Sequence, residues 1–142
     1  MGKLKTYKVT GTSHYLDNIM ELAYDNVDFE YTKKELIEAG YENERIFKYD
    51  FSIKSFELVP EPTNEYDPNA IKVLADGLIV GYIKAGSCKH INKVIAENRI
   101  EKISGKIEGG KYKYIGYDYE TEKYFMDKGE KSFFVELDII EL

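Results

Sequence analysis

Residues 58–84 read LVPEPTNEYDPNAIKVLADGLIVGYIK, and this stretch decides the fold. Two strand-like runs, 70–74 and 78–84, flank Asp76-Gly77, a dipeptide typical of a tight β-hairpin turn. The preceding segment Pro60–Pro62 interrupts the strand pattern, because proline has no N–H to donate to a ladder. The stretch therefore predicts a rigid polar turn that leads into an antiparallel hairpin.

The sequence on either side predicts more strands than helices. Strands are expected where β-branched and aromatic residues gather, at 4–11, 45–51, 53–59, 100–107, 112–119 and 132–140. Helices are expected where apolar residues recur at helical spacing or a capping box begins, at 15–24, 32–40 and 87–98. Gly109-Gly110 is a candidate turn, and the polar segment 120–130 a candidate loop. Since strands and helices do not alternate as in a parallel sheet, we expect a small antiparallel barrel or half-barrel.

Composition limits the class of protein. The chain has 142 residues, 43% of them hydrophobic, which is enough for one packed core. Its apolar runs are far shorter than the roughly 20 residues that span a bilayer, and no secretory signal is recognisable in its first residues. The single cysteine, Cys88, cannot form an internal disulfide, which fits a reducing compartment. We therefore expect a cytoplasmic protein with no membrane partner.

Charge narrows the choice of ligand. Twenty basic and 26 acidic residues give a net charge of -6. A protein that grips long duplex DNA through many phosphates is usually basic, so this balance argues against that mode. A small pocket for the end of one strand stays compatible, because stacking and a few hydrogen bonds can carry its affinity.

The turn before the hairpin holds the most suggestive pair of side chains. Asn64 and Asp67 favour bonds from side chain to backbone, and Pro68 keeps Asp67 extended. Tyr66 and Asp67 thus place an aromatic face beside a carboxylate on a stiff loop, which suits one nucleotide. The alternative is a polar turn in which Asn64 and Asp67 only cap the backbone.

The same residues carry a family resemblance. Glu61–Val73 (EPTNEYDPNAIKV) followed by Gly77–Ile83 (GLIVGYI) resembles the HIRAN domain family, in its stand-alone bacterial or phage form. Val9-Thr10-Gly11 in the first strand, the helix after Gly81-Tyr82, and Gly105-Lys106-Ile107 add to the resemblance. It implies an OB-like antiparallel β-barrel with accessory helices, which makes the expected class α+β and mainly β.

The resemblance also implies a function. HIRAN domains of eukaryotic fork-remodelling helicases capture the 3′-hydroxyl end of single-stranded DNA. For this chain it implies a module in DNA repair that binds a single-stranded DNA end, non-catalytic and without cofactor or metal. A helicase or nuclease would then act as a partner in trans.

Site residues follow from the matching positions. Tyr66 would stack on the terminal base, Asp67 would bond the 3′-hydroxyl, and Tyr82 would face the strand. Where end-binding members place an arginine and an aromatic residue after the first strand, this chain has Ser13 and His14. His14 can stack or donate, whereas Ser13 brings no charge for a phosphate.

Supporting residues complete the expected site. Asn64 would shape the loop, and Lys84, Lys89 and Lys93 would lie near phosphates. A solvated helix face is the alternative for these lysines.

The expected organisation is a single HIRAN-like domain over 1–142. Its core comprises 1–14 and 45–142, and a helical pair is inserted at about 15–44.

Residues 111–119 (KYKYIGYDY) interleave aromatic residues with lysines, as a single-strand stacking surface does. Alternation along a strand puts Tyr112 and Tyr114 on one face and Lys111 and Lys113 on the other. This separation favours an edge strand with core tyrosines and solvated lysines.

Motifs of catalysis are weak in this sequence. Gly105-Lys106 lacks the earlier glycine and the following Ser/Thr of a P-loop. His14, Cys88 and His90 supply only three N/S ligands, whereas structural zinc takes four. We therefore expect a binding module and no enzyme; the alternative is a protein–protein interaction module on the same barrel without nucleic-acid binding.

Overall fold

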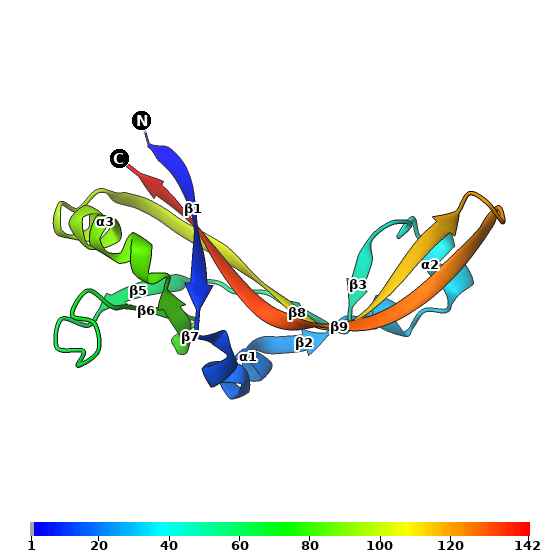
Figure 1. Cartoon of the computed structure of the whole chain (residues 1–142), viewed down its shortest axis with the longest axis horizontal. Helices are drawn as coiled ribbons and strands as arrows, with labels where there is room; N and C mark the ends of the chain where they lie inside the picture. The colour runs from blue at the N-terminus through cyan, green and yellow to red at the C-terminus, as the bar shows by residue number, and fades with distance from the viewer. Residues whose placement is uncertain (1) are drawn as a thin grey trace. The chain divides into compact units, whose positions relative to one another are not determined.

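The computed structural model describes residues 2–142 (Figure 1). The strands are β1 (Lys3–Thr10), β2 (Ala23–Asp25), β3 (Arg45–Phe47), β4 (Tyr49–Phe51), β5 (Phe56–Pro60), β6 (Ile71–Ala75), β7 (Leu78–Ile83), β8 (Ile100–Asp118) and β9 (Lys123–Glu141). The helices are η1 (Thr12–Tyr15), α1 (Leu16–Leu22), η2 (Val27–Glu30), α2 (Lys33–Glu38) and α3 (Ala85–Ala96), with η marking a 3-10 turn. The expected class, α+β and mainly β, is confirmed.

The chain divides into two compact units. The first holds the residues up to Leu22, 52–107 and 134–142, and the second holds 23–51 and 108–133. The long strands β8 and β9 contribute residues to both. A single domain with a helical insertion at about 15–44 stays a prediction.

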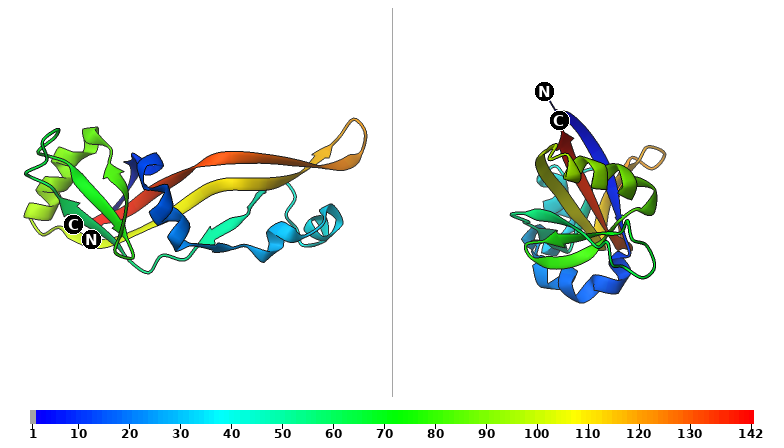
Figure 2. Two further views of the ribbon diagram at one scale, coloured as in Figure 1. Left: turned by 90° about the horizontal axis from the view of Figure 1, so that it is seen from below. Right: turned by 90° about the vertical axis from the view of Figure 1, so that its left-hand side faces the viewer.

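The first unit is a curled antiparallel sheet. The strand order is β3-β8-β9-β1-β7-β6-β5, in which β3 belongs to the second unit. The right-hand view of Figure 2 shows the strands of the first unit curling around one another. The curl brings β5 toward β8, since a Cβ added to Gly105 would lie 3.2 Å from the ring of Phe56. The sheet is thus a half-barrel of the OB-like type.

Alternating side chains fill this half-barrel. On β6, Ile71, Val73 and Ala75 are fully buried while the residues between them are partly exposed. The helix α3 adds an apolar face at helical spacing. Its buried residues are Cys88, Ile91 and Val94.

The hairpin between β6 and β7 confirms the turn prediction. Asp76 and Gly77 both have positive φ, 46° and 84°, as a turn of type I′ requires. The carboxylate of Asp76 also accepts from the backbone N–H groups of Lys54 and Ser55, at 2.9 Å each. The turn is therefore fastened to the segment that precedes β5.

Gly81 in β7 permits a close approach to β1. Its φ is 155°, and an added Cβ would lie 2.5 Å from the backbone oxygen of Thr10. No larger residue fits without moving β1. The next residue, Tyr82, therefore pairs closely with Thr10, the last residue of β1.

The second unit has its own small core. Leu36 of α2, Ile46 of β3 and Ile115 of β8 are buried together. The predicted capping box is confirmed, because Thr32 accepts from the Glu35 N–H and Glu35 accepts from the Thr32 N–H. A short second sheet pairs β2 with β4.

Two turn predictions were wrong. β8 runs unbroken through Gly109-Gly110, and β9 already begins at Lys123 inside the expected loop 120–130. The glycines serve a close approach, since a Cβ on Gly109 would lie 2.5 Å from the Cα of Phe133. Polar residues suit a strand with solvent-exposed faces, and pairing of β9 with β8 overrides their local preference for a loop.

The helices differ slightly from expectation. In the expected helix 15–24, Tyr15 ends the 3-10 turn η1, α1 spans Leu16–Leu22, and Ala23 and Tyr24 belong to β2. α3 begins and ends two residues earlier than predicted. None of the helices in residues 2–142 has the length and apolar character needed to cross a membrane.

Glu141 is the buried charged residue of the first unit's core, with 5% of its surface exposed. The Tyr7 hydroxyl donates to Oε2, while His90 Nε2 and Lys5 Nζ lie 2.6 Å and 3.4 Å from Oε1. Burial acts to raise the pKa of Glu141, but the bonds from Tyr7 and His90 outweigh it and hold that pKa below its usual value. The folded protein therefore favours the ionised carboxylate.

We predict that Tyr7→Phe lowers the free energy of unfolding by about 1–3 kcal/mol near neutral pH, because Glu141 stays buried and loses a donor. A carboxylate with a lowered pKa stabilises the fold above its unfolded value of about 4.3, and this is lost as pH falls through the folded pKa. Urea denaturation at several pH values should therefore show the difference from wild type shrinking below about pH 4.

The matched control is Thr6→Ala. It removes an exposed hydroxyl that donates to Asp138, the residue opposite Thr6 on β9. Its cost should stay near or below about 0.5 kcal/mol. A Tyr7→Phe difference that stayed constant with pH would contradict the role given to Glu141.

Candidate functional site

Asn64 organises the loop between β5 and β6. Its Oδ1 accepts from the backbone N–H groups of Tyr66, at 2.9 Å, and Asp67, at 3.0 Å. Such side-chain caps stand in for backbone turn bonds. The loop is therefore fixed in the free protein, as the sequence indicates.

Within this loop, Tyr66 and Asp67 have different surroundings. The Tyr66 side chain is 96% exposed, so its ring contacts solvent on both faces. Asp67 is half-buried, and its Oδ1 accepts from the Asn69 N–H at 2.8 Å. An ionised carboxylate has two oxygens and about four acceptor positions, so this cap leaves capacity for a donor from a ligand.

Glu61 joins the loop to the sheet. Its carboxylate accepts from Asn64 Nδ2, at 3.1 Å, and from the Tyr82 hydroxyl, and lies 3.8 Å from Lys72 Nζ. The bond from Tyr82 is the main cause that lowers the pKa of Glu61. The same bond is the main cause that raises the pKa of Tyr82 to about 12.

Tyr82 lies on the outer face of β7. It stands opposite Thr10 of β1 and Lys72 of β6, whereas the buried neighbours Val80 and Ile83 face the core. Its ring lies 6.4 Å from that of Tyr15, at 44°. Two tyrosine rings thus lie close together, one on β7 and one at the end of η1.

His14 lies in the 3-10 turn next to Tyr15. It is exposed, and its backbone N–H donates to the Gly11 oxygen at 3.0 Å. Residues 13–18 line a hollow of about 420 Å³. Of the predicted site residues, Asn64, Tyr66, Asp67 and Tyr82 are linked through hydrogen bonds of Glu61 and Asn64, whereas His14 is connected to them only as the residue before Tyr15.

The predicted lysines stand on or beside α3. Lys84 is the residue before the helix, and Lys89 and Lys93 are exposed on it. The helix contacts the loop, since Asn92 Nδ2 donates to the Asn69 oxygen at 3.0 Å. Lys89 precedes Asn92 by three residues and so lies on the same side of the helix.

Cys88 is a core residue. It is 1% exposed, and burial followed by the charge of Asp67 raises the pKa of its thiol. Within residues 2–142, no group of three or more His, Cys, Asp or Glu side chains is arranged to hold a metal ion.

Sequence reasoning missed the parts played by Glu61, Lys72 and Tyr15. The alternation of β6 does place Lys72 outward, beside the outward Tyr82. Glu61 and Tyr15, however, meet Tyr82 only through folding across the sheet, and no local spacing signals that contact.

The family model of the HIRAN domain matches residues 6–126 of the 142-residue chain. No curated protein and no solved structure matches the chain. The matched range includes the Asn64 loop, Tyr82 and α3. The chain belongs to the HIRAN domain family, a family of nucleic-acid-binding modules.

Proposed function

We propose that the chain binds the 3′ end of single-stranded DNA at the loop between β5 and β6. The observation that carries the proposal is the Asn64 turn, which holds the backbone of Tyr66, whose ring is open to solvent, and of the next residue, Asp67. The exposed ring offers a stacking surface for a terminal base, and the carboxylate of the next residue offers an acceptor for the sugar hydroxyl.

Asp67 gives the site its preference for a strand end. A carboxylate accepts from a hydroxyl and repels a phosphate, so a strand with a free 3′-hydroxyl binds more tightly than one with a 3′-phosphate. The Asn69 N–H on Oδ1 keeps the carboxylate in place without satisfying all of its acceptor positions.

The remaining side chains contact the rest of the strand. Tyr66 stacks on the terminal base, and Tyr82 and His14 contact the nucleotides behind it. The Tyr82 hydroxyl donates to Glu61, and this bond orients its ring. Lys84, Lys89 and Lys93 lie toward the phosphates.

Affinity should be modest. The first unit carries 11 basic and 12 acidic side chains, a net charge of -1, so few counterions are released on binding. Stacking contributes about 1–3 kcal/mol per base. Such a module would act in the cytoplasm, non-catalytically, in DNA repair beside a helicase or nuclease.

We predict that wild type binds a short single strand ending in a 3′-hydroxyl at least about tenfold tighter than the same strand ending in 3′-phosphate. Asp67→Asn should reduce this ratio to about threefold or less, because the amide oxygen can still cap Asn69 but carries no charge. Fluorescence anisotropy with both oligonucleotides measures the ratio.

Glu65→Gln is the control, since Glu65 is an exposed neighbour with the same charge. It should retain the wild-type ratio. Equal affinity for the two ends in wild type, or a ratio unchanged by Asp67→Asn, would refute end recognition; no binding at low salt would favour the protein-interaction alternative.

We predict that Tyr66→Ala weakens binding of the 3′-hydroxyl strand by about 5-fold to 100-fold, the contribution of one stacked base. Tyr66→Phe should bind nearly as wild type, because the ring is kept. The exposure of Tyr66 implies that neither change alters the melting temperature.

Tyr119→Ala is the control, since Tyr119 is also 82% exposed but lies in the second unit. It should leave affinity unchanged. Similar losses of affinity for Tyr119→Ala and Tyr66→Ala would show that the strand stacks on any exposed aromatic ring and not at a specific site.

A further inference from the structure

The second unit has one sheet face that its core does not use. β3 pairs with β8 so that Arg45 stands opposite Tyr114 and Phe47 opposite Tyr112. Between them, Ile46 points to the other face, into the buried cluster with Leu36. Arg45, Phe47, Tyr112 and Tyr114 therefore share the face away from that cluster.

This arrangement reverses the expected sides of β8. Tyr112 and Tyr114 occupy the face away from the core cluster, while Lys113 lies over the ring of Phe29 at 4.8 Å and donates to the Tyr31 oxygen. The alternation was predicted correctly, but its inner and outer sides were exchanged. The tyrosines are thus available to a ligand.

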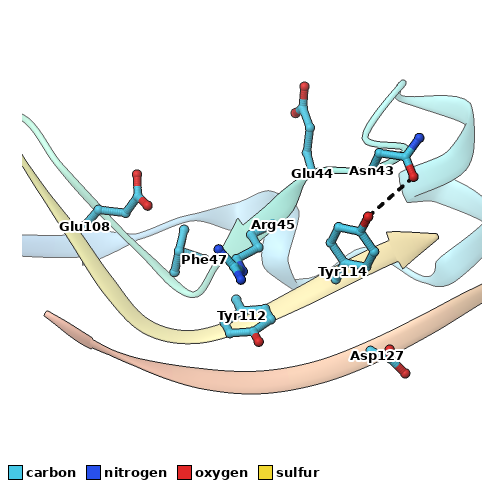
Figure 3. Close-up of a pocket in the computed structure, with 8 residues that line it drawn as sticks. All are labelled: Asn43, Glu44, Arg45, Phe47, Glu108, Tyr112, Tyr114 and Asp127. Carbon is cyan, nitrogen blue, oxygen red and sulfur yellow. Dashed lines mark hydrogen bonds between the residues drawn. The ribbon is translucent and has the colours of Figure 1, made fainter. Parts of the chain in front are cut away.

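These side chains line a pocket of about 720 Å³ (Figure 3). Arg45 lies over the ring of Tyr112, with its guanidinium carbon 5.1 Å from the ring centre. Phe47 packs edge-on to the same ring, with ring centres 5.8 Å apart. Tyr114 donates to Asn43 at 3.4 Å, which orients its ring. The pocket is built of aromatic rings that already accommodate one guanidinium.

Three carboxylates complete the lining, from Glu44, Glu108 and Asp127. Arg45 is the single basic residue there, so the pocket is net negative. The whole second unit has 14 acidic and nine basic side chains, a net charge of -5, against -1 for the first. This charge repels a phosphate backbone and attracts a cation.

We propose that this pocket docks a lysine- or arginine-rich segment of a partner protein. The aliphatic stem of a basic side chain lies against Phe47 and Tyr114, and its charged end pairs with Glu108 or Asp127. The surface is separate in sequence and charge from the nucleic-acid site proposed above, and the two can be tested independently.

The test uses the full chain and a fluorescent synthetic peptide of alternating arginine and glycine, with a glutamate–glycine peptide of equal length as comparison. We predict that wild type binds only the arginine peptide. Glu44→Gln, Glu108→Gln and Asp127→Asn together should weaken binding about tenfold, because they remove the carboxylates that attract and pair with the basic side chains of the peptide.

The matched control changes three exposed carboxylates of the second unit outside the pocket, with Glu38→Gln, Glu120→Gln and Glu122→Gln. This triple variant has the same net charge and should bind within about twofold of wild type. Tyr114→Ala and Tyr119→Ala both leave the charge unchanged. Tyr114→Ala should weaken binding of the arginine peptide, whereas Tyr119→Ala should leave that binding as in wild type.

Equal losses in both triple variants would overturn the proposal, since binding would then reflect net charge alone. The proposal would also be overturned if wild type did not bind the arginine peptide. It would be overturned as well if a single-stranded oligonucleotide displaced the peptide and the pocket variant no longer bound that oligonucleotide. Strand-end binding by the first unit should be unchanged in the pocket variant.

Discussion

The site depends on one constraint, the carboxylate of Glu61 between the Tyr82 hydroxyl and the Asn64 amide. This carboxylate connects a residue in the middle of the sheet to a loop that has no strand partners of its own. Asn64 then passes the constraint to the backbone of Tyr66 and Asp67. Because every step is a hydrogen bond to a fixed group, the loop gains the rigidity of the half-barrel.

Where structure follows from neighbours in sequence, it could be predicted. Asp76-Gly77 has the backbone freedom that a tight hairpin needs, and Thr32 with Glu35 satisfies a helix end within one turn. The Asn64 turn belongs to the same class, because its bonds span only two or three residues. Residue types at short spacing therefore indicated both the half-barrel and the loop that carries the candidate site.

Where structure depends on distant partners, the sequence misled. Gly109-Gly110 has the composition of a turn, but its lack of side chains serves the close approach of Phe133. The faces of Tyr112 and Lys113 were exchanged because the buried side of β8 is decided by Ile46. Ile46 pairs with Lys113, which lies 67 residues later in the chain. Glu61 was overlooked for the same reason, since its partner lies across the sheet.

The place of β9 in the sheet has a consequence for biosynthesis. β9 lies between β8 and β1, and pairs along its length with β1, from Lys3 opposite Glu141 to Val9 opposite Val135. A ribosome makes β1 early and β9 after every other strand. Until β9 has been made, β1 and β8 lack the strand that lies between them, so the half-barrel cannot close before β9 emerges from the ribosome.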